Sequence, residues 1–266
     1  MHPIERLRYV ARSGGDGPSL LVREAAGALA GFTAEPAALV TACRRLISRH
    51  PHVAPIWWVA ARVLAAPDPS HEAWAATQEV EDDETPLHLI DLLPEGALVC
   101  LLGWPELSAS ALPPRGDVQA LIVDSLGEGS GLVRRLERIG CDPVLVEERG
   151  LGAAAAEADV VLIESIGLGG DALLATAGSL AAAAVARHAG KKVWAVAGVG
   201  RVLPGRLWEA YLRRNTDDAD AWDLDFDRVP LALCDGVVGP SGLQTVAQAL
   251  ARADCPIVPE LLKSAI

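Results

Sequence analysis

The sequence predicts an α/β protein, in which a helical N-terminal domain is followed by a Rossmann-like domain with a parallel sheet. From residue 97 onward, short apolar runs alternate with segments of helical character, as in βαβ units. Residues 1 to about 75 instead show the apolar spacing of helices. The acidic run 81–84 lies between the two regions, and we interpret it as a solvated face or linker. We therefore place the domains at 1–90 and 91–266.

The N-terminal region carries four expected helices. Apolar residues recur at helical spacing at Ile4, Leu7 and Val10, and Pro36 stands where a first helical turn tolerates proline. The fourth segment contains Pro55 and is still expected to be helical, because it is apolar almost throughout. The expected helices cover 4–14, 19–32, 35–50 and 51–66.

The C-terminal region carries the strands. Expected strands cover 97–103, 118–124, 143–147, 160–165, 192–198 and 231–239. Expected helices cover 130–140, 174–190, 204–215 and 241–253. The stretch 159–198 is the clearest unit, with a strand, a Gly-rich loop, an Ala-rich helix and a second strand. Ligands of such sheets bind beyond the carboxyl ends of the strands, which directs attention to Glu164 and Ser165.

Composition excludes several classes of function. The chain has 266 residues and a formal net charge of −12, which argues against the nucleic-acid backbone as the main partner. A small phosphorylated ligand is still allowed, because it needs only a few N–H groups and one or two cations. Five scattered cysteines without a CxxC pair, no recognisable signal peptide and no membrane-length apolar run predict a reduced, cytoplasmic protein. No cofactor is expected, and the acidic stretch 217–227 lacks the spacing of a metal site.

Four segments together resemble the translation initiation factor 2B alpha/beta/delta-subunit family, which includes the methylthioribose-1-phosphate and ribose-1,5-bisphosphate isomerases. SRHPHVAPIWWVAARVL is similar to the family's Arg-Pro-containing helix start. ALIVDSLGEGSGLVRRLERIGCDPVLVEE is similar to its strand, E-S-R-P-like loop, helix and strand. VVLIESIGLGGDALLATAGSLAAAAVARHAGKKVWAVAG is similar to its G-A-D to G-T stretch, and LALCDGVVGPSGLQTVA to its ending. The resemblance implies pairing of the α/β domains, and we expect a homodimer.

The departures from that family concern its proton-transfer residues. In the isomerases, a Cys after the first Rossmann strand and the Asp of the G-A-D turn move the proton. Here Ser165 stands at the Asp position, and Ala175-Thr176 replaces an Asn-Lys pair. At the Cys position the chain reads LLGWPEL, and Cys100 lies earlier, inside the strand. A serine without a base does not shuttle protons near neutral pH, so the resemblance implies that the isomerase chemistry is absent or uses other groups.

Two arginine positions of the family also differ. The Arg of the E-S-R-P-like loop appears as Leu126 or Gly127. The Arg of the Arg-Pro pair appears as His50, with Arg49 beside it. Arg49 and His50 are candidates for contacting an anionic ligand between the domains, or they form a solvated helix end.

Two carboxyl-edge residues are candidates for catalysis. Glu164 and Ser165 end the strand that starts the crossover. Glu164 is either a general base that replaces the missing carboxylate, or a residue that caps the next segment or pairs with Arg201.

The candidate ligand-binding residues lie in loops and at strand ends. Gly178 and Ser179 interrupt a helical run and form either a helix N-terminus that holds an anion or a close helix–sheet contact. The loop 124–131 either cradles a phosphate or is an ordinary turn with Ser130 as N-cap, and Glu128 within it disfavours a phosphate. The remaining candidates are Gly103, Trp104, Ser125, Gly129 and Asp235, and we expect Asp235 to face the same crevice as Trp104.

Three functions follow from these observations. The first is an initiation factor 2B-like protein that binds a phosphorylated sugar or nucleotide in the inter-domain crevice without isomerase chemistry. The second is an aldose–ketose sugar-phosphate isomerase with substitute acid–base residues. The third is a regulatory interaction subunit of a nucleotide-exchange-type assembly.

Overall fold

The computed structural model describes residues 18–32, 34–216 and 219–263. The helix expected over 4–14 lies outside the described residues. The chain divides into two compact units that interleave along the sequence. The helical unit comprises Met1–Asp83, Val199–Ala219 and Arg252–Ile266, and the α/β unit comprises Glu84–Gly198 and Asp220–Ala251. The division into domains at 1–90 and 91–266 stays a prediction. It assigns each domain one continuous segment, whereas each compact unit consists of more than one segment.

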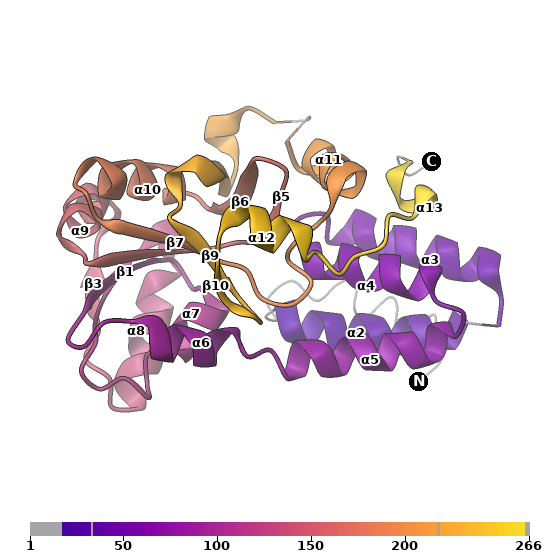
Figure 1. Cartoon of the computed structure of the whole chain (residues 1–266), viewed down its shortest axis with the longest axis horizontal. Coiled ribbons are helices and arrows are strands. Elements are labelled where there is room, and N and C mark those ends of the chain that lie inside the picture. The colour runs from indigo at the N-terminus through magenta and orange to yellow at the C-terminus, as the bar shows by residue number, and fades with distance from the viewer. Residues whose placement is uncertain (1–17, 33, 217–218, 264–266) are drawn as a thin grey trace. The chain divides into compact units, whose positions relative to one another are not determined.

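Within the described residues, four N-terminal helices and two later ones belong to the helical unit (Figure 1). Their bounds are α2 Pro18–Leu29, α3 Pro36–Arg49, α4 Ala54–Ala65, α5 Pro69–Glu81, α11 Gly205–Thr216 and α13 Pro259–Leu262. Helices α3, α4, α5 and α13 each have a proline in the first turn, where its missing N–H costs nothing. At α5, the Asp68 carboxylate also accepts the N–H groups of Ser70 and His71, both at 3.1 Å.

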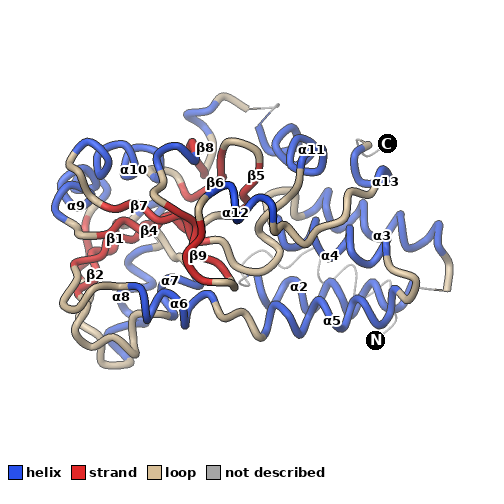
Figure 2. The backbone as a smooth tube through the Cα atoms, in the orientation of Figure 1, coloured by secondary structure: helices blue, strands red, loops and turns tan. Residues whose placement is uncertain are grey.

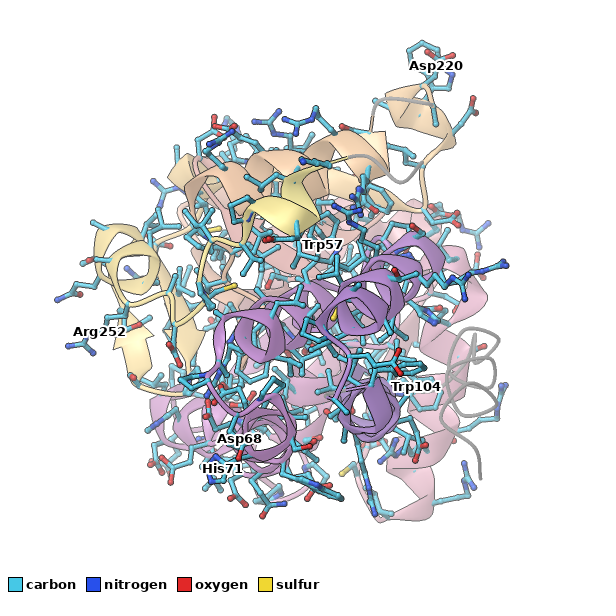
Figure 3. All side chains as sticks on the ribbon, turned by 90° about the vertical axis from the view of Figure 1, so that its right-hand side faces the viewer. Trp57, Asp68, His71, Trp104, Asp220 and Arg252 are labelled. Carbon is cyan, nitrogen blue, oxygen red and sulfur yellow. The ribbon has the colours of Figure 1, made fainter. Side chains whose placement is uncertain are left out.

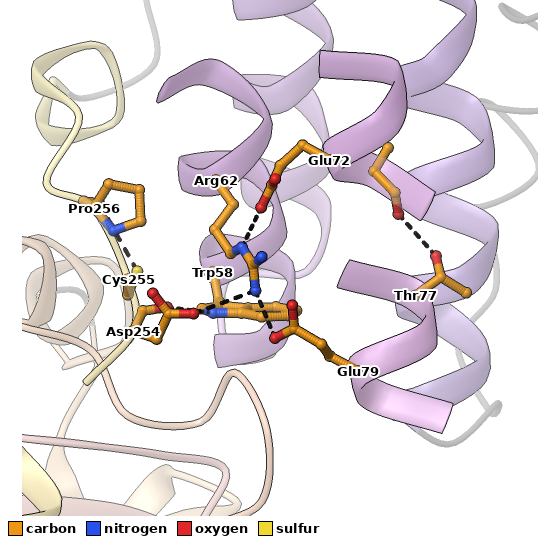
Figure 4. A network of polar contacts seen from close by, with 9 residues as sticks. Trp58, Arg62, Glu72, Thr77, Glu79, Asp254, Cys255 and Pro256 are labelled. Atoms are coloured by element: carbon orange, nitrogen blue, oxygen red, sulfur yellow. Dashed lines mark hydrogen bonds and ion pairs between the residues drawn. The ribbon is translucent and has the colours of Figure 1, made fainter. Parts of the chain in front are cut away.

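Helix α4 forms the core of the helical unit. Almost all of its residues are buried, and it packs against α2, α3 and α5. Trp57 contacts Tyr211 edge-to-face at 5.8 Å between ring centroids. Trp58 lies beneath the guanidinium of Arg62, which also pairs with Glu72, Glu79 and Asp254 (Figure 4). Trp57 and Trp58 are therefore core residues of this unit.

The α/β unit is built on a seven-stranded sheet with the order β10-β9-β7-β4-β1-β2-β3. Six strands are parallel, and β10 pairs antiparallel with β9. The strands are β1 Leu98–Leu102, β2 Gln119–Val123, β3 Val144–Val146, β4 Val160–Glu164, β7 Lys192–Val196, β9 Gly236–Gly239 and β10 Gly242–Gln244. Figure 2 shows them between two helical layers. The predicted α/β class with a helical N-terminal part is confirmed.

Helices cover both faces of the sheet. Figure 1 shows α9 and α10 on one side and α6, α7 and α8 on the other. The helices are α6 Thr85–Leu92, α7 Glu106–Ser110, α8 Gly129–Arg138, α9 Leu151–Glu157, α10 Ser179–His188 and α12 Val246–Ala251. The core between sheet and helices is aliphatic and includes Val99, Leu101 and Ile122. This doubly wound arrangement brings the βα loops to one edge of the sheet.

A second, antiparallel sheet was not predicted. It has the order β5-β6-β8, with β5 Gly167–Gly169, β6 Ala172–Thr176 and β8 Phe226–Pro230. The start of the helix expected at 174–190 is wrong, because 172–176 is strand β6 and α10 begins only at Ser179. Likewise β9 begins at Gly236 and not at 231, and α12 begins at Val246, after β10. In the part of the chain that is described, no helix has both the length and the apolar character of a membrane span.

Candidate functional site

Gly103 brings three segments together at the carboxyl edge of the parallel sheet. It follows β1 directly, has a φ of +62°, and donates its N–H to Val123 O at 3.0 Å. A Cβ at this position would lie 3.3 Å from both Glu128 Oε2 and Thr176 Cγ2. The left-handed φ and the crowding both favour glycine here. The candidate site is therefore the edge at which the β1, β2 and β6 loops meet.

Ser125 and Gly129 hold the β2–α8 loop in place. The buried Ser125 hydroxyl donates to Ala177 O at 2.7 Å, which ties this loop to the turn before α10. Gly129 packs so closely that a Cβ would lie 2.8 Å from Asp124 Cα and from Val123 O. Both residues lie at the predicted edge of the sheet, and the contacts that they make there hold the loop in place.

The chain's own carboxylate occupies the N-terminus of α8. Asp124 Oδ1 accepts the Ser130 N–H at 2.9 Å. The Ser130 hydroxyl instead donates to Gly127 O at 3.3 Å, so Ser130 is not the N-cap that one of our interpretations proposes. A phosphate at this helix end would compete with Asp124 for donors and meet its negative charge.

The same arrangement recurs at α10. The sequence predicts that Gly178 lies inside a helix. In the structure it instead precedes α10 and has a φ of +93°. Ser179 is buried, and the Leu180 N–H donates to Asp227 Oδ2 at 2.8 Å. The helix N-terminus that we expected at Gly178–Ser179 exists, and a carboxylate from β8 already lies against it.

Glu164 caps a third helix. It is the last residue of β4, and its carboxylate accepts the N–H groups of Leu107 at 3.2 Å and Ser108 at 2.8 Å. The Ser108 hydroxyl donates to the same carboxylate at 2.9 Å. These contacts engage both of its oxygens in holding α7, which is an earlier helix and not the next segment that our capping interpretation named.

Neither Ser165 nor Cys100 presents a nucleophile or base at this edge. Ser165 is fully buried, and its N–H donates to Val196 O at 2.8 Å. Cys100 lies in the middle of β1, and burial raises its thiol pKa to about 12. A thiol with that pKa stays protonated near neutral pH.

Glu128 and Asp225 form a carboxylate pair at the edge. Partial desolvation, and then the negative charge of Asp225, raise the pKa of the Glu128 carboxyl. The segment that carries Asp225 is held beside Gly178, because the Ala177 N–H donates to Asp225 O at 3.1 Å. Sequence reasoning noted Glu128 only as unfavourable to phosphate and missed Asp225, since only the pairing of β8 with β6 brings it here.

Trp104 lies across α8. Its side chain is 41% exposed, and a Cβ at Gly131 would lie 2.9 Å from its Cζ3. The Arg135 guanidinium lies 5.8 Å from the ring centroid. Trp104 therefore follows β1 as predicted, and its ring rests on the helix.

Asp235 does not share the edge of Trp104, contrary to our expectation. Because β9 begins at Gly236, Asp235 lies at the amino edge of the sheet. There its carboxylate accepts the Val193 N–H at 2.9 Å and pairs with Arg187 at 2.7 Å.

Arg49 and His50 belong to the helical unit. Arg49 is the exposed last residue of α3, and the buried His50 donates its N–H to Leu46 O at 2.9 Å. Burial, and then the neighbouring His50, lower the pKa of His52. The position of Arg49 fits a cation that complements a helix C-terminus. No group of three His, Cys, Asp or Glu side chains in the described ranges is placed to hold a metal ion.

The architecture defines a class of protein by fold. A mostly parallel α/β unit with an added antiparallel sheet accompanies a helical unit, and this is the fold of translation initiation factor 2B subunits and of 5-methylthioribose 1-phosphate isomerase. The resemblance predicted from the sequence is thus confirmed at the level of the fold. No protein-family model matches the sequence, and no curated protein matches it.

Three solved structures illustrate the similarity. Translation initiation factor eIF-2B of Pyrococcus horikoshii OT3 has a TM-score of 0.79 at 15% identity, covering 93% of this chain and 98% of that chain. The eIF2B beta subunit of Chaetomium thermophilum has a TM-score of 0.76 at 16% identity, covering 98% and 94%. The 5-methylthioribose 1-phosphate isomerase of Pyrococcus horikoshii OT3 has a TM-score of 0.66 at 13% identity, covering 95% and 88%.

Proposed function

We propose that this chain is a non-catalytic, initiation factor 2B-like protein that acts as a subunit of an assembly, with a homodimer as its basic form. The observation that carries the proposal is the filling of three helix N-termini by the chain's own carboxylates. Asp124, Glu164 and Asp227 accept N–H groups of α8, α7 and α10. A sugar phosphate needs such donors, and it would be repelled by the carboxylates that hold them.

The chemistry of the edge supports the same proposal. An aldose–ketose isomerase must give and take a proton near neutral pH. Glu164 holds a helix end, Ser165 is buried, and the Cys100 thiol has a raised pKa inside the sheet. One solved structure of this fold is a tetrameric complex of eIF2B beta and delta subunits, at 16% identity and a TM-score of 0.74, which supports a role in assembly.

One observation favours a second function, an isomerase with a substitute acid–base group. Glu128 lies beside Gly103, the residue that directly follows β1, and the pKa of the Glu128 carboxyl is raised. A carboxyl with a raised pKa transfers protons more readily near neutral pH than an ordinary one. Glu128 is therefore the residue on which turnover would depend.

The two functions are separated by incubating the protein with 5-methylthioribose 1-phosphate or ribose 1,5-bisphosphate and following the ketose product by NMR. We expect no product, and we expect an oligomer by light scattering at the same protein concentration. Product formation that Glu128→Gln abolishes, and that Glu137→Gln on the exposed face of α8 leaves intact, would establish the second function.

A further inference from the structure

Trp222 is presented to solvent on an ordered turn. Its side chain is 81% exposed, the highest exposure of any large apolar side chain among the described residues. It is the middle residue of the 3-10 turn Ala221–Asp223, which is closed by the Asp223 N–H donating to Asp220 O at 2.9 Å. Tryptophan is enriched at protein interfaces, where it supplies a large rigid contact area.

The turn is strongly acidic. Asp220 and Asp223 flank Trp222, and both are exposed. Neither forms a salt bridge with any residue in the described ranges. Figure 3 shows Asp220 projecting at the top of the view, well apart from Trp104. The turn therefore presents one aromatic ring between two unpaired negative charges.

The α/β unit carries a surface of opposite character on α8. Arg134, Arg135 and Arg138 are exposed, and within the described ranges they form no salt bridge. Beside them is a hollow of about 150 Å³, lined by both polar and apolar groups, which include those of Trp104, Leu132, Arg135, Leu136 and Ile139. Ile139 is 56% exposed at its rim. Glu106 also lines the hollow and is the acidic group within it.

The two surfaces are opposite in charge, and the volume of the hollow, about 150 Å³, equals that of a cavity that holds one benzene ring. The exposure of Trp222 shows that it does not fill the hollow of its own chain. A second copy of the chain brings the complementary surface, and a two-fold axis would form the contact twice.

We propose that Trp222 of one copy docks into the hollow between α7 and α8, beside Trp104, of a second copy, with Asp220 and Asp223 against the arginines of α8. This inference rests on the proposed role in assembly and names the surface that builds the dimer. The aromatic ring supplies the buried contact, and the charge pairs fix its orientation and make the contact weaken with salt.

The test is the dimer dissociation constant, measured by sedimentation equilibrium for the full chain. We expect Trp222→Ala and Arg135→Glu each to raise it about tenfold or more, as truncation of an interface anchor does. Trp74→Ala, which removes an exposed tryptophan of the helical unit, is the matched control and should leave it unchanged. A mixture of the Trp222→Ala and Arg135→Glu variants keeps one intact contact and should dimerise more tightly than either variant alone.

Two results would overturn the inference, and they are distinguishable. If the wild type dimerises and both variants dimerise equally well, another surface builds the dimer, and the proposed function survives. If the wild type is monomeric at concentrations up to the solubility limit, both the surface and the proposed homodimer are wrong. Far-UV circular dichroism of each variant confirms that it is folded, and Asp223→Lys provides a second variant on the same turn.

Discussion

Replacing Glu164 with glutamine removes the charge that holds the N-terminus of α7. The carboxylate accepts two N–H groups and one hydroxyl, from Leu107 and Ser108. Glutamine keeps only one acceptor oxygen. Its amide NH2 group takes the place of the other oxygen, so one of the three donors loses its hydrogen bond. A bond to a charged acceptor contributes about 1.5–3 kcal/mol and a bond to a neutral one about 0.5–1.5 kcal/mol. Losing one bond and weakening the others therefore costs about 2 kcal/mol.

The assay is hydrogen exchange of the two amides that donate to Glu164. A loss of about 2 kcal/mol corresponds to a factor of about 30 in a local equilibrium. We expect the Leu107 and Ser108 amides to exchange faster by that factor in Glu164→Gln. Glu137→Gln on α8 is the control and should leave both rates unchanged. Unchanged exchange in Glu164→Gln would refute the capping role of this carboxylate.

Three further predictions concern stability and are measured by urea unfolding. Arg62→Lys keeps the charge but loses the planar fork that reaches Glu79 at 2.6 Å and stacks on Trp58, and we expect a cost of about 1–3 kcal/mol. Gly103→Ala places a side chain at a φ of +62° and costs about 1–2 kcal/mol. The pKa of the Glu128 carboxyl is raised in the folded state, so the wild type loses stability as the pH rises above 4.5, the ordinary pKa of a glutamate. Glu128→Gln has no such carboxyl, so we expect the variant to keep that stability.

The predictions for Gly103 and Glu128 each have a control or a contradicting result. Gly152 lies in α9 with no atom within 4 Å of an added Cβ, so Gly152→Ala should stabilise the protein by up to about 1 kcal/mol. Equal effects of the two glycine substitutions would contradict the strain assigned to Gly103. For Glu128, the sign follows because the folded state keeps its proton longer than the unfolded state does. If the free energy of unfolding had the same pH dependence in the wild type and in Glu128→Gln, the raised pKa of Glu128 would be refuted.

The positions of most parallel strands along the chain were predictable because each of them is a continuous apolar run. Five of the six expected strands, from 97–103 to 192–198, contain the observed β1, β2, β3, β4 and β7. Helix α11 was likewise visible from its apolar spacing. These elements owe their form to local composition, which a single sequence displays.

The second sheet was hidden because its pairing is nonlocal. The segment Ala172–Thr176 has alanine and leucine, which favour a helix, yet it pairs with residues 226–230 as strand β6. Burial between two neighbouring strands overrides local propensity in such a segment. Gly178, with its φ of +93°, then separates the strand from α10.

The carboxylates at the helix N-termini were hidden for the same reason. Asp227 reaches Leu180 across 47 positions of sequence, and Glu164 reaches Ser108 across 56. Glycine and serine at a βα turn predict an anion-binding helix end, but they do not reveal whether the chain supplies the anion itself. Sequence reasoning therefore directed attention to this edge and left its occupant open.

Binding of ribose 5-phosphate to the wild-type protein, followed by thermal shift, tests the central claim most directly. A ligand present at 100 times its dissociation constant stabilises the folded state by about 2.7 kcal/mol, so binding would be visible. Because Asp124, Glu164 and Asp227 already accept the N–H groups of the helix N-termini, we predict no stabilisation at any concentration. Saturable stabilisation that Leu180→Pro abolishes, by removing an N–H of α10, would contradict the account.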